Sequence, residues 1–193
     1  MGVNHCNPCQ SMLRLRTFGG CWLEQDGRPL DAFSGNRKAL ALLAAVAAAE
    51  RSLSRDVAMA LLWPESDEAR ARTSLKQLVH WLRRKLERPD LFKPSVDLRL
   101  DPLHIGSDLC EFRDALNRGQ YDIAARLHTG PFLDGFFVRD GGEVERWAAA
   151  ERSSCLRGYA RALQALAEGA AARGGHVGGG GVVAPTGERP TVQ

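Results

Sequence analysis

The first residues with a clear hydrophobic pattern alternate between apolar and polar positions. Leu13 and Leu15 alternate with arginines, and the Asp26-Gly27 pair further on is a strong signal for the tight turn of a β-hairpin. The segment from Arg37 to Glu50 is rich in alanine and leucine and predicts a buried helix. The pattern therefore predicts a short antiparallel β element followed by a helix.

Capping residues predict two more helices. Ser54 begins one that ends before Pro64, and residues 66–68 place a cap and two acids at the start of a third, expected to run to about Glu87. Residues 91–105 return to alternation, broken by two prolines, and predict short strands. Strands, three helices and a closing hairpin, in this order, are the plan of a winged helix-turn-helix.

The third predicted helix has two contrasting faces. At about 100° per residue, one apolar stripe collects Leu75, Leu78, Val79, Leu82 and Leu86. Polar and basic residues lie opposite this stripe, and a DNA major groove admits such a helix, with Arg and Gln at base edges and Lys or Arg at phosphates. With two bases of the predicted hairpin, the expected DNA contacts are Arg70, Thr73, Lys76, Gln77, His80, Trp81, Arg83, Arg84, Lys93 and Arg99.

Charge is concentrated on the same segment. The whole chain carries a net charge of +3, whereas residues 70–93 alone hold 8 basic and 2 acidic residues. Such a concentration is expected of a face that binds a polyanion, although a solvated helix flank would also produce it.

The second half of the chain predicts paired helices. They are expected from Ser107 or Asp108 to Asn117, from Tyr121 to His128, and from Glu143 to about Ala172. An apolar connector broken by glycine, residues 132–137, precedes the last one. Antiparallel helices with short loops indicate a tetratricopeptide-like layer, although no clean 34-residue repeat is visible. A glycine-rich, flexible tail is expected from residue 173.

Composition excludes several classes of protein. Apolar residues make up 44% of the chain and charged residues 25%, which is typical of a globular protein. The longest uncharged apolar run, Ala39 to Ala49, is shorter than the roughly 20 residues a bilayer span needs. The first residues do not resemble a secretory signal, and an odd number of cysteines fits reduced thiols. These features favour a cytoplasmic protein that does not interact with a membrane.

The sequence predicts no site for catalysis, a metal or a cofactor. Cys6 and Cys9 have CxxC spacing, but no second ligand pair follows that would complete a zinc site. The acids are scattered over capping and surface positions, so no catalytic constellation is expected. The prediction is a protein that is not an enzyme, without catalytic residues, bound metal or cofactor.

The chain resembles a known family. Residues 13–62, followed by Trp63-Pro64, look like the opening of SARP-type bacterial regulators, and residues 69–75 leading into 82–86 look like their recognition helix. Residues 108–167 are similar to the start of the second domain of that family, for example in Gly130-Pro131-Phe132-Leu133 and Glu145-Arg146-Trp147. The resemblance thus extends from residue 13 to residue 167.

The resemblance implies an architecture and partners. It implies an OmpR/PhoB-type winged helix followed by a bacterial transcriptional activator domain, hence a mainly α protein with small β elements. The expected divisions are a flexible arm (1–10), the winged helix (11–105), a truncated, tetratricopeptide-like activator domain (106–172) and a disordered tail (173–193).

The hypothesis that follows is a sequence-specific transcription regulator, an activator, that reads double-stranded promoter DNA with residues 66–87. RNA polymerase is the protein partner implied, and a homodimer on DNA repeats is left open. The competing hypothesis is a helical protein–protein interaction module that does not bind DNA.

Overall fold

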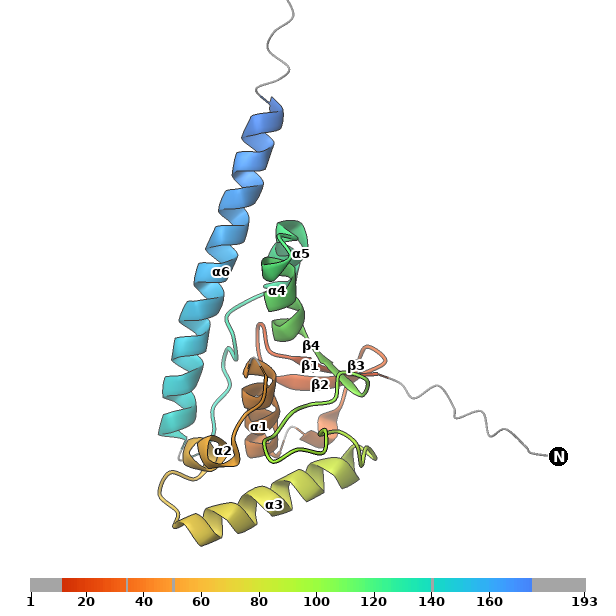
Figure 1. The fold of residues 1–193 in the computed structure, drawn as a ribbon, viewed down its shortest axis with the longest axis vertical. Coiled ribbons are helices and arrows are strands. Elements are labelled where there is room, and N and C mark those ends of the chain that lie inside the picture. The colour runs from red at the N-terminus through yellow and green to blue at the C-terminus, as the bar shows by residue number, and fades with distance from the viewer. Residues whose placement is uncertain (1–11, 34, 50, 140, 175–193) are drawn as a thin grey trace, which may run out of the picture.

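The computed structural model of the chain describes residues 12–33, 35–49, 51–139 and 141–174. This part is mainly helical, with one small sheet at its centre (Figure 1). One long helix runs along the side of the molecule and another forms its lower edge in the same view. The expected arm (1–10) and nearly all of the expected tail (173–193) lie outside the described residues.

The sheet joins the beginning of the chain to its middle. It contains β1 (Leu13–Arg16), β2 (Trp22–Gln25), β3 (Arg28–Pro29) and β4 (Ile105–Ser107), in the order β3-β2-β1-β4. β1 pairs antiparallel with β2 and parallel with β4. The predicted turn between β2 and β3 is confirmed, because Asp26 and Gly27 have φ angles of 52° and 75°, as a type I′ turn requires.

Three helices follow the β2–β3 hairpin, as predicted. They are α1 (Arg37–Ala48), α2 (Arg55–Leu62) and α3 (Glu68–Lys85), preceded by a short 3₁₀ turn, η1 (Asp31–Phe33). Each helix is capped by a side chain that accepts a hydrogen bond from a backbone N–H of its first turn, which satisfies a donor that has no partner within the helix. The caps are Asn36, Ser54 and Asp67.

The segment between α3 and β4 corrects one expectation. Residues 91–105 do not form regular strands. They form a hairpin in which Phe92 and Leu100 make an isolated bridge. Leu98 of the hairpin makes a second isolated bridge with Leu53, which lies between α1 and α2. Pro94 and Pro102 have no N–H to donate to a ladder, which accounts for the interruption. The regular strand of this region, β4, begins only at residue 105 and joins β1.

The second half adds three helices, α4 (Asp108–Asn117), α5 (Tyr121–Leu127) and α6 (Gly142–Gly174). α4 and α5 lie against each other and against α6, which extends beyond them (Figure 1). The expected helices are thus present, while the tetratricopeptide-like arrangement stays a prediction. None of the helices in the described ranges is long and apolar enough to cross a membrane.

One hydrophobic core serves both halves. Phe18, two residues after β1, packs edge-on against Phe112 of α4, with 5.2 Å between ring centroids. The connector between α5 and α6 buries Phe132 and Leu133 in the same core. Arg152 of α6 donates hydrogen bonds to the carbonyl oxygens of both connector residues, at 2.7 and 3.1 Å, and so holds this segment against the sheet.

A buried carboxylate joins β1 to α4. Asp108 accepts hydrogen bonds from the N–H and hydroxyl of Thr17, at 2.9 and 2.6 Å, and from the N–H of Phe18 at 3.2 Å. The sequence predicted Ser107 or Asp108 as a helix cap. Ser107 is the capping residue but makes no side-chain capping bond, while Asp108 reaches across to the strand.

We predict that Asp108→Ala destabilises the fold by about 2–5 kcal/mol, because it leaves the N–H groups of Thr17, Phe18 and Leu109 and the hydroxyl of Thr17 without this partner. Asp122→Ala is the matched control, since Asp122 forms only an exposed ion pair with Arg126 within α5. It should cost less than about 1 kcal/mol. Urea unfolding followed by circular dichroism measures both, and equal losses would contradict the role assigned to Asp108.

Candidate nucleic-acid interface

α3 lies at the lower edge of the molecule with one long side open to solvent (Figure 1). Its ends carry charges that suit the helix dipole. Asp67 accepts a hydrogen bond from the N–H of Arg70 at 2.9 Å, and Glu68 lies in the first turn. The last turn is basic, with Arg83, Arg84 and Lys85. These charges stabilise the helix at both ends and place positive charge at its C-terminal end.

The predicted apolar stripe of α3 is confirmed as the buried face. Leu75 and Leu82 are at most 1% exposed, and the other members of the stripe are also buried. Ala71 is buried one turn before Leu75 and extends the same face. Because this side fixes the rotation of the helix about its axis, the opposite side must face outward.

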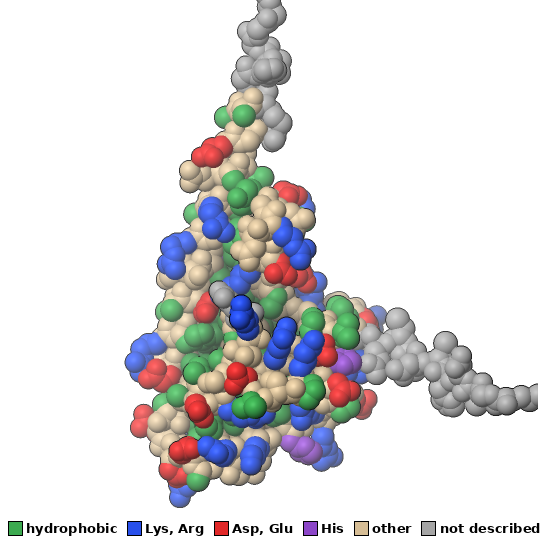
Figure 2. Space-filling view, in the orientation of Figure 1, with side chains coloured by type: hydrophobic (Ala, Val, Ile, Leu, Met, Phe, Trp, Pro, Cys, Tyr) green, Lys and Arg blue, Asp and Glu red, His purple; other side chains and the backbone are tan. Residues whose placement is uncertain are grey.

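The outward face carries most of the residues predicted to contact DNA. These residues share exposed side chains and lie along the full length of α3: Arg70, Thr73, Lys76, Gln77, His80 and Arg84. Figure 2 shows basic side chains and a histidine along this edge. Arg70 pairs with Asp67 at 3.1 Å, whereas Lys76 and Arg84 form no ion pair with any described residue. The two unpaired bases are available for an anionic partner.

Two predicted contact residues turn toward the protein instead. Trp81 is half-buried and packs edge-on against Phe33 of η1, with 5.4 Å between ring centroids. Arg83 is half-buried, and its guanidinium lies 5.9 Å from the ring centre of Phe92 on the hairpin. Both side chains therefore contribute to packing α3 against its neighbours.

The hairpin brings two further predicted residues to the same part of the molecule. Arg99 is exposed, while Lys93 is half-buried, with its ammonium nitrogen 3.9 Å from a carboxylate oxygen of Asp101. Arg55 of α2 donates a hydrogen bond at 2.8 Å to the carbonyl oxygen of Val96, at the tip of the hairpin. The hairpin is thus held to α2 and, through Phe92, to α3.

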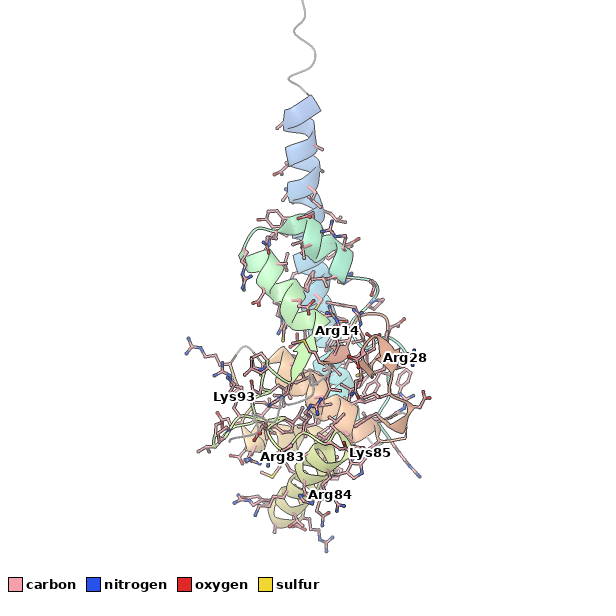
Figure 3. All side chains as sticks on the ribbon, turned by 90° about the vertical axis from the view of Figure 1, so that its right-hand side faces the viewer. Arg14, Arg28, Arg83, Arg84, Lys85 and Lys93 are labelled. Atoms are coloured by element: carbon pink, nitrogen blue, oxygen red, sulfur yellow. The ribbon has the colours of Figure 1, made fainter. Side chains whose placement is uncertain are left out.

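Two basic residues of α3 outside the predicted set are exposed as well. Arg72 pairs with Glu68 at 2.5 Å, and Lys85 has no ion pair among the residues that the structure describes. Figure 3 shows Arg83, Arg84 and Lys85 spread around the end of α3, with Lys93 to one side. Lys85 could have been found from its position in the basic run that ends the helix, at the edge of the apolar stripe.

A cavity of about 560 Å³ adjoins α3 beside Gln77 and Trp81. Its other side is formed by the start of α1 and by Val138 and Arg139, which lie between the connector and α6. Lys38 of α1 lies there with its ammonium 5.2 Å from the ring centre of Trp63. The segment between the connector and α6 therefore reaches the edge of the outward face of α3, which no pattern in the sequence indicated.

The small sheet, the three helices and the bridged hairpin define a winged-helix-like domain that continues into a helical second half. The fold is similar to that of Mycobacterium tuberculosis EmbR in complex with a low-affinity phosphopeptide, with a TM-score of 0.58 and 25% sequence identity. The similarity covers 86% of this chain and 48% of EmbR, so the chain spans about half the length of that protein. It supports a SARP-like fold. No protein-family model and no curated protein sequence matches the chain.

The described residues contain no metal site of the kind that the CxxC pair could have suggested. Cys6 and Cys9 lie outside the described residues. Within the described ranges, no three His, Cys, Asp or Glu side chains are grouped so that they could hold a metal ion. The charged surface of α3 therefore remains the candidate site.

We predict that Leu82→Ala lowers the free energy of unfolding by about 2–5 kcal/mol, because it truncates a fully buried leucine. Arg84→Ala on the outward face should change it by less than about 0.5 kcal/mol. Thermal or urea unfolding of the two variants tests this difference. Similar small losses for both would mean that the buried face of α3 is assigned wrongly.

Proposed function

We propose that this protein is a DNA-binding transcription regulator that reads duplex promoter DNA with the outward face of α3. The observation that carries the proposal is the arrangement of α3, whose apolar side is buried while its opposite side presents exposed polar and basic residues at the edge of the molecule. The SARP-like fold supports the same class of function.

The roles proposed for individual residues follow from their positions. Gln77 and Arg84 lie on the middle of the outward face, and their amide and guanidinium groups suit adenine and guanine edges in the major groove. Lys76 lies toward the edge of this face and suits a phosphate. Arg70, Thr73 and His80 complete the helix surface, and Lys93 and Arg99 extend it onto the hairpin. Trp81 and Arg83 would act mainly by holding α3 in place.

Two partners beyond DNA belong to this proposal. The second half, α4 to α6, would contact RNA polymerase and so make the protein an activator. A homodimer on repeated DNA sites would place two α3 helices in successive major grooves. The competing function, a helical interaction module without DNA binding, predicts that the basic face of α3 is solvated and has no preference for any DNA sequence.

The test begins with selection of bound sequences from a random duplex pool, followed by fluorescence anisotropy on the selected site at several salt concentrations. We predict that Lys76→Ala weakens binding to selected and unrelated DNA alike. It should also reduce the slope of log K against log salt by about one, because one phosphate contact is lost. Asp122→Ala, an exposed change far from α3 in sequence, is the control and should leave the slope unchanged.

Loss of a base contact should change sequence preference rather than binding to all DNA. Gln77→Ala and Arg84→Ala are expected to cost about 1–3 kcal/mol on the selected site and less on unrelated DNA, so that base preference relaxes. The proposed interface is refuted if all three α3 variants keep the affinity, salt slope and preference of the unaltered protein. Failure to enrich any sequence would instead favour the interaction module.

A further inference from the structure

A second charged site lies away from the outward face of α3. A cavity of about 730 Å³ is lined by residues at the end of α1, in α4 and in α6. A volume of this order is typical of small-molecule sites. Its polar and charged lining consists of Arg51, Arg113, Asp114, Asn117, Ser154, Arg157 and Arg161.

The charge of this cavity is strongly positive. Four arginines line it against a single aspartate. Arg113 is already engaged, because it donates hydrogen bonds to Glu151 of α6 at 2.6 Å and to the carbonyl oxygen of Ala48. The other three arginines are exposed and form no ion pair within the described part of the chain. Three guanidinium groups therefore remain without a carboxylate partner around one cavity.

The two thiols that line the cavity do not offset this charge. Burial raises the pKa of Cys155 to about 11, and burial also raises the pKa of Cys110. Cys110 donates a weak hydrogen bond to the carbonyl oxygen of Ala47, 3.3 Å away. Both thiols are protonated at neutral pH, so the positive charge of the arginines is not cancelled by thiolate.

The wall between α4 and α6 is tightly packed. Gly158 of α6 lies where an added Cβ would meet Leu116 of α4 at 2.7 Å and Phe112 at 3.3 Å. A larger residue at this position would require the side chain of Leu116 to move. Arg157 directly precedes Gly158 in α6, and Arg161 follows it by three residues. Because the helix is regular, the contact at Gly158 also fixes the backbone of both arginines relative to α4.

We propose that this cavity binds a small polyanion through the guanidinium groups of Arg51, Arg157 and Arg161. Guanidinium groups pair with phosphate and carboxylate oxygens through two parallel hydrogen bonds, so a ligand with several such groups fits the lining. Asn117 and Ser154 supply neutral hydrogen-bonding groups. None of the ten residues predicted to contact DNA lines the cavity, so this site does not depend on the proposed function.

The experiment is isothermal titration calorimetry on the full chain in the absence of DNA. The probes are ATP and pyrophosphate for phosphate, citrate for carboxylate, and adenosine as the uncharged comparison. The double variant Arg157→Gln, Arg161→Gln removes two charges from an exposed helix surface, where glutamine is a good helix former. Arg28→Gln, Arg118→Gln is the matched control, because these arginines are exposed, are not among the residues that line the cavity and form no ion pair with a described residue.

The expected result is binding of at least one of the three anions and not of adenosine. The double variant in the cavity should weaken that binding at least about tenfold, because two charge-assisted contacts are lost, and the control should match the unaltered protein. Binding of ATP and pyrophosphate would identify phosphate as the recognised group, and binding of citrate alone would identify carboxylate. The proposal is overturned if none of the anions binds, or if their binding is equal in the cavity variant and the control.

Discussion

The carboxylate of Asp108 is the group on which the junction of the two halves depends. It is 2% exposed and satisfies the backbone of Thr17 and Phe18 where β1 ends, at the same point where α4 begins. A buried carboxylate is costly unless its oxygens are fully hydrogen-bonded, and four donors from Thr17, Phe18 and Leu109 meet that requirement. Phe18 also packs against Phe112 of α4. The hydrogen bonds of Asp108 and the shared core therefore hold the same two segments together. The position of α4 and α5 beside the sheet follows from both.

Packing along one side also fixes the position of α3, the helix proposed to bind DNA. Its buried leucines, the ring contact of Trp81 with Phe33 and the position of Arg83 over Phe92 fix its rotation and its distance from the hairpin. The outward residues take no part in this packing. A helix held this firmly by one side presents the other as a preformed surface, which reduces the entropy lost when a rigid partner such as a DNA duplex binds.

Local signals in the sequence were sufficient for the helices and the first hairpin. Caps, prolines and periodicity placed α1, α2 and α3 within about two residues of their ends, and the period of α3 identified its buried face. Contacts between distant segments could not be read in this way. The inward packing of Trp81 depends on Phe33. The cavity lined by Arg51 and Arg157 is formed by three elements that are far apart in the chain. The regular strand after the hairpin, β4, is determined by its pairing with β1 rather than by its own pattern.

The parallel pairing of β4 with β1 has a consequence for how such a protein can be divided. Residues 105–107 form one edge of a sheet whose other strands lie near the start of the chain. A fragment that stopped before β4 would expose the backbone groups of β1 as an open edge, which is a template for pairing with other chains. The winged-helix-like part therefore cannot be separated before β4 without opening its sheet. Exchange of segments between proteins of this architecture preserves the sheet only when β4 and the start of α4 are inherited together with β1.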